Sequence, residues 1–265
     1  MTNEPVLLPT SHGPIAAMVG LPGGAPRAAV LVVQGQGGSR AGVNQTWKRL
    51  AQSLVAEGYA TLRSDYSGVM ESWNADPRER IDGVRELVRW FGERTDGAPL
   101  LVVSSCYGLS PAAALARDGA ALLGAAVITP PLWFGSETPK ISLVNRKRRT
   151  IVRRASGLPR RLAYRVRYGP ARASFFEQAE RGNPISDLED LVAGTPTWMF
   201  AGSKDVCIKP LQELLPHLKE RGTVELEVVD DATLYGAPSP IAQSAIYERV
   251  RAWVHRCTTT ANADA

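Results

Sequence analysis

Several residue types and patterns are scarce in this sequence of 265 residues, and each scarcity argues against a class of protein. The cysteines are Cys106, Cys207 and Cys257, without a C-x-x-C pair or zinc-site spacing, so we expect neither a disulfide framework nor a bound metal. No apolar run approaches the roughly 18–20 residues that a membrane-spanning helix needs. The opening residues lack a basic region followed by an apolar one, so we expect no secretory signal and a cytoplasmic protein.

Histidine is equally scarce, and its three positions limit any mechanism that needs an imidazole. They are His12, His217 and His255. The rest of the composition is ordinary, because hydrophobic residues make up 44% of the chain and charged residues 22%, which excludes global disorder. The length suits one large α/β domain.

Acidic residues are absent from one long stretch. Residues 138–176 contain twelve Lys or Arg and no Asp or Glu, whereas the rest of the chain carries a net charge of −7. A solvated helix face is the ordinary explanation of charged residues, but like charges repel one another and favour an anionic partner. We expect CoA or a phosphopantetheine arm, an acidic acyl carrier protein or an anionic membrane surface, contacted by Arg148, Arg149, Arg153 and Arg154. No RNA- or DNA-binding motif accompanies the segment, so nucleic acid ranks last.

Short apolar runs alternate with amphipathic stretches along the chain. The runs predict strands near residues 28–33, 59–63, 100–103, 124–128, 197–200 and 224–229. The amphipathic stretches predict helices near residues 47–57, 79–93, 109–117, 211–220 and 241–256. This alternation is typical of βαβ units, so the expected fold class is α/β, with a doubly wound and mainly parallel sheet. The opening runs at 6–8 and 15–19 predict an antiparallel hairpin.

One segment interrupts this alternation. Residues 132–191 separate two predicted strands by about 60 residues, whereas such connections usually take roughly 2–6. We therefore expect an inserted, basic, helical lid at 132–191, between two parts of one α/β core at 1–131 and 192–257. Residues 258–265 are expected to form a flexible tail.

The strongest chemical signal lies where the run at 100–103 meets an alanine-rich helix. The connecting residues read S-S-C-Y-G at 104–108. A nucleophile on a tight strand-to-helix turn needs small residues two positions to each side, and Ser104 and Gly108 provide them around Cys106. A cysteine at a helix N-terminus also gains thiolate character from the unpaired amides there. The alternative interpretation of Cys106 is a buried structural cysteine.

Four stretches together resemble the α/β-hydrolase superfamily, especially its small single-domain branches with cysteine at the turn, such as dienelactone-hydrolase-like proteins. They read VLVVQGQGG at 30–38, GYATLRSDYSG at 58–68, VVSSCYG at 102–108 and PTWMFAGSKD at 196–205. The resemblance covers nearly the whole chain, and it implies the α/β-hydrolase fold.

The resemblance also implies roles for individual residues. Cys106 falls on the nucleophile position, and the backbone amides of Gln36 and Tyr107 fall on the oxyanion hole, which stabilises developing negative charge. Asp205 falls on the acid position, although a turn carboxylate that caps the next helix is its alternative interpretation. The glycine-rich loop at 35–38 matches neither phosphate-binding motif, so we expect no cofactor.

The histidine of the family pattern is missing. The loop after the last predicted strand reads D-D-A-T-L-Y at 230–235, which puts Leu234 where the base should stand. His12 lies on the first hairpin, about 19 Å from the turn at 4.8 Å per strand. His217 lies about 12 Å along a helix that leaves the site, and His255 lies near the far end of the last helix. Tyr235, Asp230 and Asp231 are the substitutes that lie nearby in the sequence.

Together these features predict an enzyme of acyl transfer, which hydrolyses or transfers a (thio)ester through Cys106 without a histidine base. A thiol tolerates that loss better than a hydroxyl, because some thiolate exists at neutral pH. The first alternative is a lyase, cyclase or isomerase that uses the same pocket without water. The second is a non-catalytic binding protein on a hydrolase scaffold.

Overall fold

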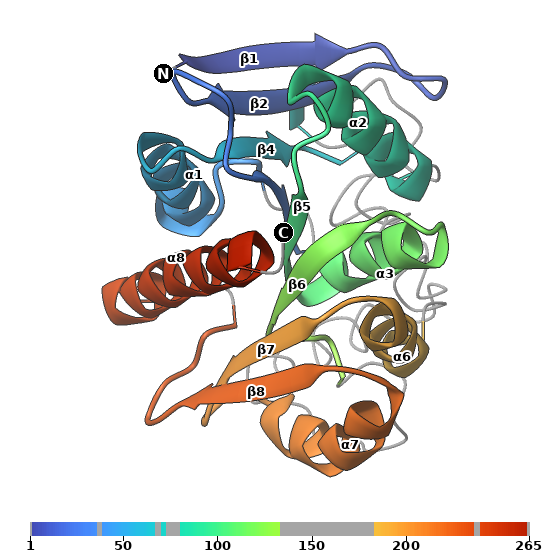
Figure 1. The fold of residues 1–265 in the computed structure, drawn as a ribbon. Helices are drawn as coiled ribbons and strands as arrows, with labels where there is room; N and C mark the ends of the chain where they lie inside the picture. The colour runs from blue at the N-terminus through green and yellow to red at the C-terminus, as the bar shows by residue number, and fades with distance from the viewer. Residues whose placement is uncertain are drawn as a thin grey trace, which may run out of the picture.

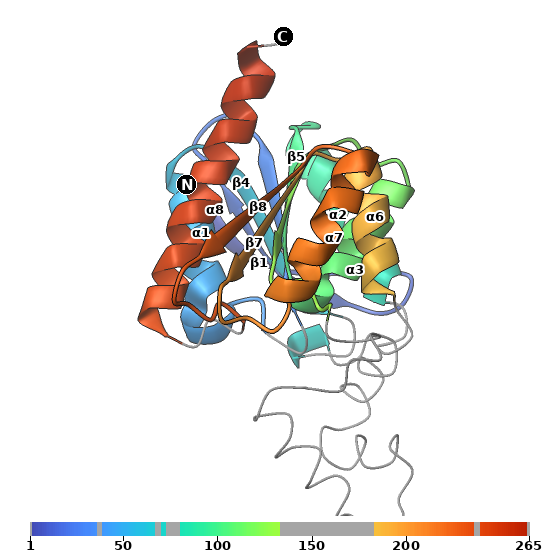
Figure 2. The same ribbon diagram turned by 90° about the horizontal axis from the view of Figure 1, so that it is seen from below.

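The computed structural model describes residues 2–35, 39–66, 70–72, 80–132, 183–235 and 239–263. Within these ranges the chain forms an 8-stranded sheet between two layers of helices (Figures 1 and 2). In spatial order the strands are β1 (Thr2–Leu8), β2 (Ile15–Leu21), β4 (Ala60–Ser64), β3 (Ala29–Val33), β5 (Leu100–Ser105), β6 (Leu122–Ile128), β7 (Thr197–Gly202) and β8 (Val224–Val229).

The described helices cover both faces of the sheet. They are α1 (Thr46–Ala56), α2 (Arg80–Arg94), α3 (Leu109–Arg117), α6 (Pro184–Gly194), α7 (Ile208–Arg221) and α8 (Pro240–Ala263), with short 3-10 turns η1 (Val43–Gln45), η2 (Met70–Ser72) and η3 (Cys106–Gly108). Helices α1 and α8 lie on one face, and α2, α3, α6 and α7 lie on the other (Figure 2). Within the described ranges, no helix is both long and apolar enough to cross a bilayer.

The pairing directions of the strands agree with how deeply the strands are buried. β1 pairs with β2 and β2 with β4 in antiparallel fashion, whereas all the other neighbours are parallel. Strands β3 and β7 are buried at every position, as expected for parallel strands covered on both faces. The predicted α/β class, the mainly parallel sheet and the opening hairpin are therefore confirmed.

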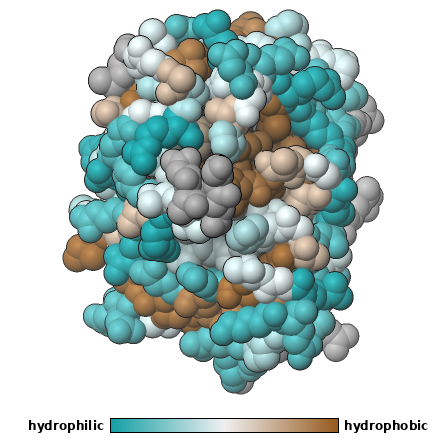
Figure 3. Space-filling model, viewed as in Figure 1, coloured by the Kyte–Doolittle hydropathy of each residue, from teal (hydrophilic) through white to brown (hydrophobic). Residues whose placement is uncertain are grey.

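The core is split by the sheet into two apolar layers. One layer packs Phe91, Leu109 and Leu188 against the sheet, and the other packs Trp47, Phe200 and Trp253 on the opposite face. On the side of the molecule seen in Figure 1, hydrophilic residues cover most of the surface and hydrophobic ones emerge in narrower bands (Figure 3).

The boundaries of the predicted insertion need a correction at its second end. Residues 133–182 lie outside the described residues, but the chain from residue 183 onward already belongs to the core. Helix α6 contacts α3 through Asp187, whose carboxylate accepts hydrogen bonds from Ser110 (2.7 Å) and Arg117 (3.1 Å). The predicted limit at residue 191 was therefore too late, because an anchored core helix precedes β7.

The predicted tail also begins too early. Helix α8 continues to Ala263, and the Thr258 side chain is buried. The Thr258 hydroxyl donates to the Val254 carbonyl within the helix (3.0 Å) and lies 3.0 Å from the Tyr59 hydroxyl. Burial and these contacts hold the helix beyond residue 257, where the prediction ended the core.

Candidate active site

Cys106 occupies a strained turn at the carboxyl end of β5. Its φ is 50°, a left-handed conformation that non-glycine residues rarely adopt, and η3 and α3 follow at once. A Cβ on Gly108 would lie 2.1 Å from the Val33 carbonyl oxygen, and one on Gly35 would lie 2.9 Å from Cβ of Cys106. The turn therefore packs directly against the end of β3, and Gly108 provides the small residue that this approach requires.

Cys106 lines a cavity of about 190 Å³ at this end of the sheet. The other lining residues are Gln34, Gly35, Gly42, Val43, Thr46, Trp47, Ser105, Ile128, Thr129, Leu234, Tyr235 and Ile246. None of these side chains is a carboxylate, an ammonium, a guanidinium or an imidazole. Cys106 is 6% exposed, so the cavity presents the thiol to small, largely apolar molecules.

Hydrogen bonds fix the end of β3 beside the thiol. The Tyr66 hydroxyl donates to the Gln34 carbonyl, and the Gln34 side-chain amide donates to the Ser64 carbonyl (3.1 Å). The Gly35 amide donates to the Ser105 hydroxyl (3.0 Å), so it is already used. Burial raises the pKa of Tyr66, which keeps its hydroxyl a donor.

Only one of the two expected oxyanion amides falls in the described structure. Tyr107 directly follows Cys106 in η3 and is buried, as the turn motif requires. Gln36 lies outside the described residues.

Asp205 lies in the expected loop after β7, but its partners are backbone amides. Its buried carboxylate accepts from Gly202 N (2.7 Å), from Leu234 N (3.1 and 3.0 Å to the two oxygens) and from Tyr235 N (3.0 Å). The acid therefore ties the loop after β8 to the loop after β7. It holds in place the residue that stands where a histidine was expected.

Asp205→Asn is expected to destabilise the fold by about 2–4 kcal/mol, because the new amide group would face buried N–H donors. Urea denaturation measures this as a lower midpoint with unchanged slope. Asp231→Asn, on the same loop but exposed, should leave the midpoint in place. Equal losses in both variants would contradict the anchoring role of Asp205.

The three substitutes proposed for the missing base differ in position, and Asp230 is not among the residues that line the Cys106 cavity. Tyr235 lines the Cys106 cavity and is 41% exposed. Asp231 is not among the lining residues; its side chain is 88% exposed and pairs with Lys204. That contact lowers the pKa of Asp231, which makes it a weaker base still. Of the three, the structure brings only Tyr235 to the cavity.

The three histidines are engaged elsewhere. His255 contacts Glu57 through Nε2 (2.7 Å) and the Tyr59 hydroxyl through Nδ1 (2.9 Å). His217 of α7 contacts Glu189 of α6 (2.7 Å), and His12 lies on the β1–β2 connection. None of them lines the Cys106 cavity, whereas Leu234 does.

This chain is similar to known proteins in its structure, but its sequence matches none of the families or curated proteins compared. A thermostable carboxyl esterase from Bacillus coagulans is similar over 97% of this chain and 99% of its own, with a TM-score of 0.70 and 13% identity. A soluble variant of the monoglyceride lipase from Saccharomyces cerevisiae is similar over 97% and 95%, with a TM-score of 0.68 and 15% identity.

An esterase from Pyrococcus furiosus is similar over 96% of this chain and 90% of its own, with a TM-score of 0.70 and 16% identity. These structures share the layered architecture and extend over nearly the whole chain. This chain has the α/β-hydrolase fold.

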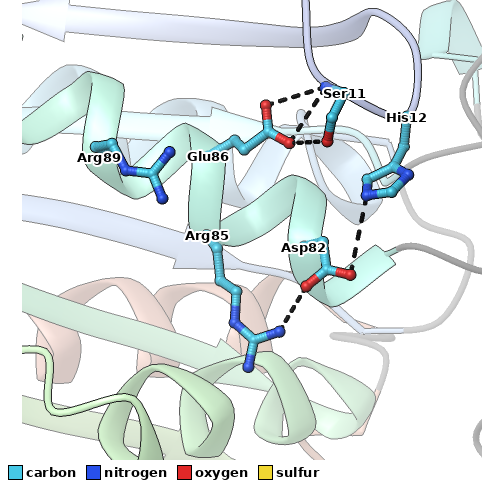
Figure 4. Close-up of a pocket in the computed structure, with 6 residues that line it drawn as sticks. All are labelled: Ser11, His12, Asp82, Arg85, Glu86 and Arg89. Carbon is cyan, nitrogen blue, oxygen red and sulfur yellow. Dashed lines mark hydrogen bonds and ion pairs between the residues drawn. The ribbon is translucent and has the colours of Figure 1, made fainter.

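On this α/β-hydrolase fold a serine, a histidine and an aspartate lie together away from Cys106, at a cavity of about 440 Å³ between the β1–β2 connection and α2 (Figure 4). The ring of His12 points toward Asp82, with Nε2 4.0 Å from the carboxylate. The Ser11 hydroxyl, however, donates to Glu86 and not to His12. Since no hydroxyl–imidazole contact exists there, the trio lacks the geometry of a catalytic triad.

The three thiols of this α/β-hydrolase fold are expected to react in a fixed order. Burial raises the pKa of Cys207 to about 12 and that of Cys257 to about 11. At pH 8 alkylation should therefore modify Cys106 first and Cys207 last, which peptide mass spectrometry measures against time. Modification of Cys257 or Cys207 before Cys106 would show that Cys106 is an inert, sealed thiol.

Some residues at the site of this α/β-hydrolase fold escaped the sequence analysis. Thr129 lines the cavity at the end of β6 with φ of 47°, which is rare for a β-branched residue. Arg80 is buried at the start of α2, with its guanidinium carbon 5.5 Å from the centre of the Tyr66 ring. Asp65 and Arg63 are buried at the end of β4. A charged residue at the carboxyl end of an apolar strand is a pattern from which both could have been predicted. Arg148, Arg149, Arg153 and Arg154 lie outside the described residues.

Proposed function

We propose that this chain is an acyl-transfer enzyme that uses Cys106 as nucleophile on esters or thioesters. The observation that carries the proposal is the position of Cys106, strained at φ of 50° on a strand-to-helix turn and lining an apolar cavity. Strained backbone at a cavity is a common mark of a functional residue. The proposal agrees with the resemblance to branches that carry cysteine at this position, and the structural neighbours described as esterases and lipases support ester chemistry.

The proposed reaction has two steps. The Cys106 thiolate attacks the acyl carbon, a C–S bond forms, and the alkoxide or thiolate leaving group departs with the electron pair of the broken bond. Backbone amides at the turn, that of Tyr107 among them, would stabilise the tetrahedral oxyanion. An acceptor then attacks the acyl-cysteine and releases the free thiolate.

The second step is the slow one in this proposal. Leu234 cannot activate water, and Asp205 is engaged with the amides of its own loop. We therefore expect a persistent acyl-enzyme and favour an acceptor more nucleophilic than water. The same observation favours, as second candidate, a lyase, cyclase or isomerase that needs no activated water.

The acyl group is expected to be short and uncharged. Side chains of Val43, Trp47, Ile128, Leu234 and Ile246 give the cavity its apolar walls, and about 190 Å³ is a small volume for a ligand site.

We propose CoA or carrier-bound thioesters as donors, because the basic stretch at 138–176 suits the phosphates of such carriers. The three cysteines form no disulfide, which agrees with a reducing, cytoplasmic location.

The test is to mix the protein with butyryl and dodecanoyl thioesters and to measure adducts by mass spectrometry. One acyl group on the Cys106 peptide is expected, formed at least about tenfold faster from the shorter donor, because the eight additional methylenes of the dodecanoyl chain do not fit a cavity of about 190 Å³. A butyryl-CoA should acylate faster than a phosphate-free butyryl thioester. A protein that carries no acyl group at Cys106 after prolonged incubation with either would contradict the proposal.

A further inference from the structure

One wall of the Cys106 cavity contains backbone in a strained, left-handed conformation, which needs contacts from other parts of the chain to persist. The segment between β3 and α1 contributes Gly42 and Val43 to the lining, and Trp47 in the first turn of α1 continues the same wall. Within it Gly42, Asn44 and Gln45 have φ of 75°, 50° and 62°. Non-glycine residues in this conformation persist only where surrounding contacts fix them.

Arg40 stands two residues before Gly42, and at Arg40 the segment is bound by residues at the end of β4. The Arg40 amide donates to the Asp65 carboxylate (2.7 Å), and its guanidinium pairs with the same carboxylate. Its carbonyl accepts from Arg63 (2.8 Å). The side chains of Asp65 (1% exposed) and Arg63 (3% exposed) therefore hydrogen-bond to the amide and the carbonyl of Arg40.

The charges of Arg40, Arg63 and Asp65 depend on one another, so these contacts are sensitive to the loss of any one charge. Burial lowers the pKa of Arg63 to about 10, and Arg40 adds to the effect while Asp65 opposes it. Burial also raises the pKa of Asp65, against the pull of Arg40. Buried charges of this kind add little net stability, but removing one partner leaves the others uncompensated. We infer that these charged residues fix the position of the Arg40 backbone more than they stabilise the fold.

We propose that Asp65 is a positioning residue, which through Arg40 holds the wall at residues 39–47 against Cys106 and so determines which chain fits beside the thiol. Asp65 touches no substrate in this proposal. The inference rests on the proposed function only in its catalytic consequence, because the shape of the wall can be measured without acyl transfer.

The experiment compares alkylation of Cys106 by N-butyl iodoacetamide and by iodoacetamide, with rates measured on the Cys106 peptide. In the wild type the apolar wall should favour the butyl reagent. In Asp65→Asn this preference is expected to fall about tenfold, as a four-carbon chain loses its apolar contacts. The rate with iodoacetamide itself should stay within about twofold, and butyryl transfer should fall by up to about 100-fold.

Glu71→Gln is the comparison variant, because Glu71 binds the guanidinium of Arg40, whereas Asp65 also binds its backbone amide (2.7 Å). The side chain of Glu71 is 63% exposed, and it also hydrogen-bonds to Asp65. Glu71→Gln should keep the butyl preference within about twofold. Arg40→Met tests the same wall from its partly exposed side, and it decides the question if Asp65→Asn does not fold.

A wild-type butyl preference in folded Asp65→Asn or Arg40→Met overturns the inference, and so does an equal loss in Glu71→Gln. If the wild type accepts no acyl group, the proposed function fails. The alkylation ratios still decide the role of Asp65 in that case.

Discussion

Leu234→His is expected to raise the steady-state turnover of a butyryl thioester by about 10²–10⁴-fold, the usual contribution of a positioned general base. The Leu234 side chain lines the cavity that contains Cys106, and its amide already lies 3.0 Å from Asp205. The Leu234 amide is shared between both oxygens of this carboxylate, so an imidazole N–H can replace one of its two contacts. The imidazole would then activate water against the acyl-cysteine.

The measurement is the rate at which an isolated acyl-enzyme loses its acyl group, followed from pH 5 to 9. In Leu234→His the rate should rise with pH through about 6.5, as a neutral imidazole becomes available. Leu234→Phe controls for ring size without a base and should gain nothing. Adding Asp205→Asn should remove most of the gain, since the ring loses its orienting acceptor. An equal gain in Leu234→Phe would mean that cavity shape, and not a base, limits turnover.

Cys106→Ala is expected to lose the acyl adduct completely and to lower acyl transfer by at least about 10³-fold, since the covalent intermediate no longer forms. Alanine suits the turn better than most residues because it is small, so the variant should keep the wild-type melting temperature within a few degrees. Adduct formation and product release are measured on the same samples.

Two further variants make this result specific. Cys106→Ser keeps the shape of the side chain but is also expected to be inactive, because a hydroxyl without a base is a poor nucleophile. Cys257→Ala removes a thiol outside the cavity and should match the wild type. Turnover that survives Cys106→Ala would instead support the lyase, cyclase or isomerase alternative.

The sheet and the turn at Cys106 were predictable because their signals are local. Apolar runs mark β3, β5, β6 and β7, and small residues flank the cysteine at the required spacing. Helix α6 was missed although its start carries a local signal: Asn183 caps it through the amides of Ile185 (3.1 Å) and Ser186 (3.4 Å), with Pro184 next in the chain. The length of the preceding basic stretch led us to assign it to the insertion.

The partners of the charged residues were not predictable, because they come from distant parts of the chain. Sequence position indicated where Asp205 lies, but only the path of the loop at 232–235 shows that it meets amides and not a ring. Asp65 stands within a stretch that supported the resemblance, yet nothing local links it to Arg40. Such contacts depend on how loops from neighbouring strands meet, which periodicity does not encode.

The last helix has a practical consequence for experiments on this protein. Ile246 on α8 lines the cavity, and the helix then continues to Ala263 on the opposite side of the molecule (Figure 2). Seventeen residues at 1.5 Å each carry the chain about 25 Å away. A fluorophore or a solid support attached there would leave the cavity entrance open to reagents, so immobilised protein should suit the kinetic assays described above.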